Sequence, residues 1–126
     1  MASVLIVDDH QPFRDAARAL LERGGFRVVG EAEDAEAALD AVQRLSPDVV
    51  LLDIQLPGDD GFAVCERILY GTDVANRASP VVVLTSGRPV ATFRRRLAGS
   101  RAAGFIAKAD LTPAMLSAML AGESTR

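Results

Sequence analysis

Chemically reactive side chains stand directly after four of the five short apolar runs in this chain. In chain order they are Asp8 and Asp9, Asp53, Thr85 and Lys108. Three carboxylates held close together repel one another, so a site built from them needs positive charge. Lys108 supplies one positive charge. A hard divalent cation would supply the rest, and a set of oxygen ligands favours Mg²⁺. Because a carboxylate can act as a nucleophile and a metal with open positions serves phosphate chemistry, this set predicts phosphoryl transfer.

The apolar runs that precede these residues predict the strands of a parallel sheet. They cover residues 4–7, 26–29, 49–52, 81–84 and 105–107, and four of them are continuous rather than alternating. Continuous runs are typical of strands that are buried on both faces. Apolar residues at helical spacing fill the intervals at about 12–23, 35–45, 61–69 and 90–98, and again from 113 onward. Asp34 and Thr112 stand at N-cap positions before the second and the last of these helices.

The alternation of strands and helices predicts an α/β fold. We expect a five-stranded parallel sheet with helices on both faces and the flavodoxin-like strand order 2-1-3-4-5. Ligands of such sheets bind beyond the carboxyl ends of the strands, which is where the acids, Thr85 and Lys108 would meet. Glu31 follows the second run, and this strand order places it at the border of the sheet, away from the other side chains.

Length and composition narrow the class of protein. The 126 residues fit one domain, predicted for residues 1–121, with 122–126 as a tail or the start of a linker. No apolar run is long enough to span a membrane, and the N-terminus does not resemble a signal peptide. Cys65 is the single cysteine, so no internal disulfide is expected, and we expect a cytoplasmic location. The net charge of −3 argues against direct binding of nucleic acid by this domain.

The same residues, in the same order, resemble the receiver domains of two-component response regulators. The matching segments are Val-Asp-Asp at 7–9, Leu-Leu-Asp-Ile at 51–54, Leu-Pro-Gly at 56–58, Gly61, Leu-Thr-Ser at 84–86 and Gly-Phe-Ile-Ala-Lys at 104–108. Each motif alone is weak, but all of them in register over essentially the whole chain are highly specific. Residues 108–113, Lys-Ala-Asp-Leu-Thr-Pro, look most similar to receivers of the NarL/LuxR transcription-factor group.

The resemblance implies a role for each matching residue. Asp53 would be the phosphoryl acceptor, and Thr85 and Lys108 would contact the phosphoryl oxygens. Mg²⁺ would be the cofactor, with Asp8 (partly through water), Asp9, Asp53 and the backbone carbonyl of Gln55 as its protein ligands.

The resemblance also implies a conformational switch formed by Thr85 and Phe105. The family often has Tyr at the second of these positions, and Phe105 has no hydroxyl to offer to a partner surface. The family often has Pro after the lysine, commonly through a cis bond. Ala109 stands there instead, so a cis peptide bond is not expected.

Partners follow from the resemblance as well. A sensor histidine kinase would donate the phosphoryl group, and phosphorylation would strengthen a homodimer or docking of an output domain through the fourth helix, fifth strand and fifth helix. Receivers of this group precede a DNA-binding domain, so the chain would be the receiver part of a transcriptional regulator or a stand-alone receiver. It would not be an enzyme, apart from phosphorylating itself from small donors and dephosphorylating itself.

Two other functions would use part of the same set of residues. A phosphohydrolase with an aspartyl nucleophile would use the same carboxylate and Mg²⁺, but such enzymes usually place a second acid where Gln55 stands, and no cap domain is present to enclose a small substrate. A receiver-like domain that only binds partners would not need the intact acids, Thr85 and Lys108.

The remaining polar residues have plainer interpretations. His10 is interpreted as a solvated loop residue, because no second histidine stands at ligand spacing. Cys65 is predicted to be buried and inert. Asp59 and Asp60 are interpreted as caps of the third helix rather than as extra metal ligands. The basic run 94–96 is either a solvated helix face or a contact surface for a partner.

Overall fold

The centre of the molecule is a five-stranded parallel sheet. The computed structural model describes residues 2–122, and its sheet contains β1 (Ser3–Val7), β2 (Arg27–Ala32), β3 (Val49–Asp53), β6 (Val81–Ser86) and β7 (Gly104–Ala107). Their order, β2-β1-β3-β6-β7, is the predicted 2-1-3-4-5 order. The two remaining strands, β4 (Gln55–Leu56) and β5 (Asp59–Asp60), form a separate antiparallel ribbon beyond the end of β3. The predicted fold class is therefore confirmed.

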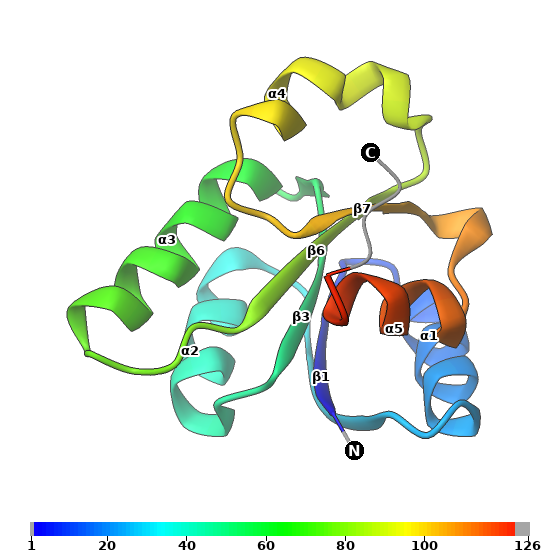
Figure 1. Cartoon of the computed structure of the whole chain (residues 1–126), viewed down its shortest axis with the longest axis horizontal. Helices are drawn as coiled ribbons and strands as arrows, with labels where there is room; N and C mark the ends of the chain where they lie inside the picture. Colours follow the sequence, from blue (N-terminus) through cyan, green and yellow to red (C-terminus); the bar gives the residue numbers. More distant parts are fainter. Residues whose placement is uncertain (1, 123–126) are drawn as a thin grey trace.

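Helices cover both faces of this sheet (Figure 1). One face carries α1 (Gln11–Arg23) and α5 (Pro113–Leu120), and the other carries α2 (Ala35–Leu45) and α3 (Gly61–Val74), followed by the 3₁₀ turn η1 (Val90–Phe93) and α4 (Arg94–Ala98). A second 3₁₀ turn, η2 (Lys108–Asp110), follows β7. The predicted caps are confirmed, since the side chains of Asp34 and Thr112 accept hydrogen bonds from the first turns of α2 and α5.

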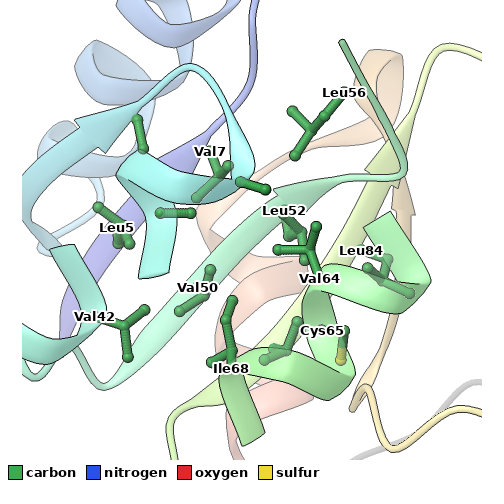
Figure 2. Close-up of a cluster of buried hydrophobic side chains, with 14 of the residues drawn as sticks. Leu5, Val7, Val42, Val50, Leu52, Leu56, Val64, Cys65, Ile68 and Leu84 are labelled. Carbon is green, nitrogen blue, oxygen red and sulfur yellow. The ribbon is translucent and has the colours of Figure 1, made fainter. Parts of the chain in front are cut away.

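Each strand of the five-stranded sheet contributes side chains to two separate cores. In β3, Val50 and Leu52 pack into the cluster formed with α2 and α3, whereas Val49 and Leu51 pack into the cluster formed with α1 and α5. Figure 2 shows the first cluster, in which Ile68 of α3 belongs to the same group as the β3 side chains. Because successive residues of a strand point to opposite faces, a strand covered on both sides is apolar at every position.

The helix α3 is longer than predicted. The sequence indicated a helix at 61–69, but the helix continues to Val74. Tyr70 and Val74 are exposed, so the apolar stripe ends before the helix does. The last turn is stabilised by Thr72, which is buried and whose hydroxyl donates to the carbonyl of Leu69 at 2.9 Å.

The helix predicted at 90–98 is divided into two pieces. Its first four residues form η1, directly after Pro89, and only the last five form α4. Phe93 is the one residue of 90–98 that is fully buried, and Leu97 packs against the same core in part. A segment this short with so little apolar anchoring has few interactions to hold a continuous α-helix.

The described part of the chain ends at Gly122. Apart from Gly122, the tail predicted at 122–126 lies outside the described residues. Across residues 2–122, no helix combines the length and the apolar character needed to cross a bilayer.

Candidate functional site

Asp53 is the last residue of β3, and its side chain is almost completely buried at the carboxyl edge of the sheet. Only 2 % of the residue is exposed. Its Oδ1 accepts a hydrogen bond of 2.9 Å from the backbone N–H of Gln55, and its Oδ2 accepts one of 3.1 Å from the ammonium group of Lys108. One oxygen therefore faces the turn that follows the strand, and the other faces β7.

Asp8 and Asp9 follow the neighbouring strand, β1. Asp8 is fully buried, and its Oδ1 accepts a hydrogen bond of 2.9 Å from the backbone N–H of His10. The Oδ2 atom of Asp8 lies 2.7 Å from the ammonium nitrogen of Lys108, as an ion pair without the alignment of a hydrogen bond. The side chain of Asp9 is 31 % exposed. The two acids thus line the same edge, one inside it and one at its opening.

Lys108 joins the carboxylates of two strands. Its ammonium group contacts both Asp8 and Asp53, and it lies 4.8 Å from the ring centroid of Phe13 in α1. Burial alone would lower the pKa of Lys108, but its contacts with the two carboxylates outweigh this effect, so the pKa is raised and the side chain stays charged. Lys108 is therefore the internal counter-ion of the site.

The surroundings of Asp53 disfavour the ionised form of its carboxyl group. Burial raises its pKa, and the negative charge of Asp8 raises it further, although the Gln55 N–H and the Lys108 ammonium group act in the opposite direction. The net direction is upward. The ionised form of Asp53 is thus less favourable here than in water, and an additional positive charge would stabilise it.

Thr85 and Phe105 lie on the strands at the other side of Asp53. Thr85 on β6 stands opposite Asp53 in the register of β3 and β6. It is buried, and its hydroxyl has no hydrogen-bond partner among the described residues. Phe105 on β7 is partly buried, with its ring centroid 6.0 Å from that of Phe93. A buried hydroxyl without a partner is costly, and this one is free to donate to a group that binds at the sheet edge.

The turn after Asp53 requires glycine at two positions. Gly58 closes the β4–β5 ribbon with a φ of +70°, a conformation that favours glycine. Gly61 begins α3 so close to the strand that a Cβ atom would lie 2.5 Å from the carbonyl oxygen of Asp53. Between them, Asp60 caps α3 by accepting from the N–H of Phe62 at 2.9 Å, as predicted, whereas Asp59 is exposed.

Arg14 was missed by the sequence reasoning. Its guanidinium group donates to the backbone carbonyl of Asp8 at 2.6 Å and to the carboxylate of Glu31 at 2.9 Å, and Arg18 donates to the same carboxylate at 2.8 Å. Burial alone would raise the pKa of Glu31, but the hydrogen bonds from Arg18 and Arg14 outweigh it, and the pKa is lowered. Glu31 on the edge strand is thereby linked to the site. The available signal was an arginine in the first turn of the helix that follows the acids.

The basic run 94–96 does not form one uniform face. Arg96 pairs with the carboxylate of Asp60 and lies 4.3 Å from the ring centroid of Phe62, so it connects α4 to the start of α3. Arg94 and Arg95 are exposed. The run is therefore exposed, with Arg96 held by a contact within the chain, and a role of the run as a contact surface for a partner stays a prediction.

The acidic edge is suited to a divalent cation. Asp8, Asp9, His10 and Asp53 each offer one ligand atom, and these atoms all lie within 4.8 Å of one another. The Oδ2 atom of buried Asp8 receives no hydrogen bond from the described residues. Carboxylate oxygens with free lone pairs are the ligands that Mg²⁺ prefers. The exposure predicted for His10 is found, but its imidazole also borders the acids.

This set of side chains at the edge of this sheet can be compared with known families. The profile of the response regulator receiver domain matches residues 4–120. The chain belongs to this family. Receiver domains bind Mg²⁺ in an acidic pocket, and sensor histidine kinases phosphorylate the response regulators that contain them. The resemblance proposed from the sequence motifs is thus confirmed.

Relatives of this receiver domain are found among transcription regulators. A Pseudomonas aeruginosa protein provisionally named a transcriptional regulator is 40% identical over 125 residues, which cover 97% of this chain and 58% of that protein. BvgA of Bordetella pertussis, provisionally named a positive regulator of virulence factors, is 42% identical over 105 residues, covering 83% and 48%. The solved receiver domain of a response regulator termed NarL from Mycobacterium tuberculosis is 34% identical, with a TM-score of 0.75 and coverage of 99% and 98%. The chain spans about half the length of these two curated relatives.

Proposed function

We propose that this receiver domain accepts a phosphoryl group on Asp53 from a sensor histidine kinase or a small phosphodonor. One observation carries the proposal above all others. The ammonium group of Lys108 lies 2.7 Å from Asp8 and 3.1 Å from Asp53, so two buried carboxylates of neighbouring strands share one fixed cation at the sheet edge. Such a cation can pair with an oxygen of a phosphoryl group bound to Asp53.

In the proposed reaction, a carboxylate oxygen of Asp53 forms a bond to phosphorus. The bond between phosphorus and the donor breaks, and its electron pair leaves with the donor group. Mg²⁺, held by Asp8, Asp9, Asp53 and the carbonyl of Gln55, would neutralise charge on the transferring oxygens. Lys108 would also neutralise charge on the phosphoryl oxygens, because its ammonium group already contacts Asp53. Hydrolysis of the acyl phosphate would reset the domain.

The switch would act through Thr85. Its buried hydroxyl, which has no partner among the described residues, would donate to a phosphoryl oxygen. Movement of Thr85 toward the phosphoryl group would leave space that Phe105 can fill. The resulting repacking would alter the surface formed by α4, β7 and α5, to which partners would bind.

The larger protein would be a transcriptional regulator. The names of the relatives and their roughly twofold length support this assignment. The receiver would occupy residues 1–121, with 122–126 as the start of a linker to an output domain. Phosphorylation would favour a homodimer or docking of that output domain.

Intact-mass measurement after incubation with acetyl phosphate and Mg²⁺ tests the acceptor. The wild-type chain should gain the mass of one phosphoryl group, and Asp53→Asn should gain none. Asp15→Asn makes the same chemical change on an exposed position of α1 and serves as the matched control, with wild-type phosphorylation expected. If Asp53→Asn gains a phosphoryl group at the wild-type rate, the acceptor lies elsewhere and the proposed mechanism is wrong.

A further inference from the structure

A nearly buried arginine of α1 ties the turn after β1 to the edge strand β2. The side chain of Arg14 is 12 % exposed. Its Nη1 atom donates to the backbone carbonyl of Asp8 at 2.6 Å, and its Nε atom donates to Glu31 Oε1 at 2.9 Å. A guanidinium group can hold both acceptors at once, because its donors form a rigid planar fork.

The carbonyl of Asp8 lies at the point where strand pairing stops. The pairing of β1 with β2 ends at Val7 and Ala32, and the N–H of Asp8 still donates to the carbonyl of Ala32 at 3.0 Å. Arg14 binds the carbonyl on the other side of the same residue. The backbone of Asp8 is thus connected to β2 twice, once directly and once through the Arg14–Glu31 pair.

This carbonyl belongs to the peptide unit that joins Asp8 to Asp9. Because the peptide unit is planar, holding its oxygen fixes how the two residues are turned relative to each other. Both residues contribute a carboxylate oxygen to the acidic cluster. Hydrogen bonds from a charged donor are stronger than those between neutral groups, so Arg14 is well suited to hold this orientation.

Arg14 does not serve as the counter-ion of the acidic cluster. Its charge is matched by Glu31, whose second oxygen also accepts from Arg18 at 2.8 Å. The cation that contacts the buried carboxylates is Lys108. The contribution of Arg14 to the site is therefore directional rather than a matter of net charge.

We propose that Arg14, supported by Glu31, is a positioning residue for the phosphorylation site. It acts through the backbone of Asp8 and sets the orientation of the Asp8 and Asp9 carboxylates for the metal ion. Groups that orient metal ligands commonly affect metal affinity by about tenfold or more, although they never touch the ion. The inference rests on the proposed function, which assigns Mg²⁺ to these carboxylates.

Calorimetric titration of the whole chain with Mg²⁺ tests this role. In Arg14→Gln, which shortens the side chain and removes the fork, the Kd for Mg²⁺ should rise by about tenfold. Arg18→Gln is the matched control. It makes the same chemical change on the same helix and also removes a donor to Glu31, but the hydrogen bonds of Arg18 go to Glu31, Glu22 and Val28. Its Kd should stay within about twofold of the wild-type value.

A second variant separates position from charge. Arg14→Lys keeps the positive charge beside Glu31, but a single ammonium group lacks the fork that reaches both acceptors. It should bind Mg²⁺ about as weakly as Arg14→Gln, and it carries the same test if Arg14→Gln does not fold. Wild-type affinity in Arg14→Lys, or equal losses in Arg14→Gln and Arg18→Gln, would overturn the inference.

Two measurements without Mg²⁺ exclude a purely structural role. Both glutamine variants lose a contact with Glu31, so urea unfolding should show both to be destabilised, whereas only Arg14→Gln should lose Mg²⁺ affinity. In NMR spectra of the metal-free chain, the amide signals of Asp9 and His10 should shift in Arg14→Gln and stay in place in Arg18→Gln. Unchanged signals in Arg14→Gln would overturn the inference.

The same experiments distinguish this inference from the proposed function. If the wild-type chain binds Mg²⁺ and is phosphorylated on Asp53 while Arg14→Gln keeps wild-type Mg²⁺ affinity, only the inference fails. If the wild-type chain neither binds Mg²⁺ nor accepts a phosphoryl group, the proposed function fails. The metal-free amide signals then decide whether Arg14 holds the turn after β1.

Discussion

Replacing Asp53 by asparagine should stabilise the fold when Mg²⁺ is absent from the buffer. Asparagine keeps the shape of the side chain but removes one of three clustered negative charges. Its single carbonyl oxygen can accept from the Gln55 N–H or from the Lys108 ammonium group, but not from both, because an NH₂ donor replaces the other oxygen. The sign of the effect is not obvious, because Asp53 both attracts Lys108 and repels Asp8 and Asp9.

The distances in the site allow the opposing terms to be compared. At an effective dielectric constant of about 20, the 3.1 Å contact with Lys108 favours ionised Asp53 by roughly 5 kcal/mol. Asp8, within 4.8 Å, opposes it by roughly 3.5 kcal/mol, and Asp9 adds a smaller term because its side chain is 31 % exposed. These terms nearly cancel. Burial of the charge then decides the sign, in agreement with the raised pKa of Asp53.

We therefore expect Asp53→Asn to be more stable than the wild type near neutral pH, by about 0.5–3 kcal/mol, which is the usual size of a single-residue effect, as measured by urea unfolding. Because the folded-state pKa is raised, the wild type regains stability as the pH falls through that pKa toward 3.8, and the difference should disappear there. Adding Mg²⁺ should stabilise the wild type more than the variant. A variant that is less stable than the wild type at neutral pH without Mg²⁺ would show that this charge balance is wrong.

Two further changes test other parts of the site and core. Gly61→Ala should destabilise the fold by about 1–3 kcal/mol in urea unfolding and should slow phosphorylation. The reason is that its Cβ atom would lie 2.5 Å from the backbone of Asp53 and Ile54. Wild-type values in both assays would contradict this prediction. Burial raises the pKa of Cys65 to about 11, so its thiol should react with a disulfide reagent only after unfolding, and stability should fall as the pH rises from 9 toward 11. Fast reaction of the folded chain would refute the assignment, and Cys65→Ser should lack this alkaline loss.

The fold was predictable because its signals are local. A strand covered on both faces is apolar at every residue, and the short polar breaks after each run mark the edge where Asp53 and Lys108 stand. The caps Asp34 and Thr112 were predictable for the same reason, since capping depends on residue type and position within a few residues. Elements without an apolar stripe gave no such signal, which is why the last turn of α3 and the 3₁₀ start of the 90–98 segment were missed.

The contacts that Arg14 and His10 make with the acidic residues could not be predicted from the spacing of residues in the sequence. Arg14 reaches Asp8 and Glu31 with a long side chain, and which groups it meets depends on how α1 packs beside β2. The orientation of His10 depends on its own backbone N–H, which donates to Asp8 and turns the chain back toward the acids. Contacts of this kind are set by the tertiary structure and not by residue type.

The division of the strands between two cores has a mechanical consequence. In β6, Val82 and Leu84 belong to one core and Val83 to the other, so the strand that carries Thr85 is clamped from both sides. A densely packed interior is stiff and does not deform gradually. The most compliant neighbour on this side is the 90–98 segment, which is anchored by Phe93 and in part by Leu97. A displacement of Thr85 would therefore move the 90–98 segment more readily than the two cores. The stiffness of the packing would thus help to determine which surface of the domain responds to a change at the site.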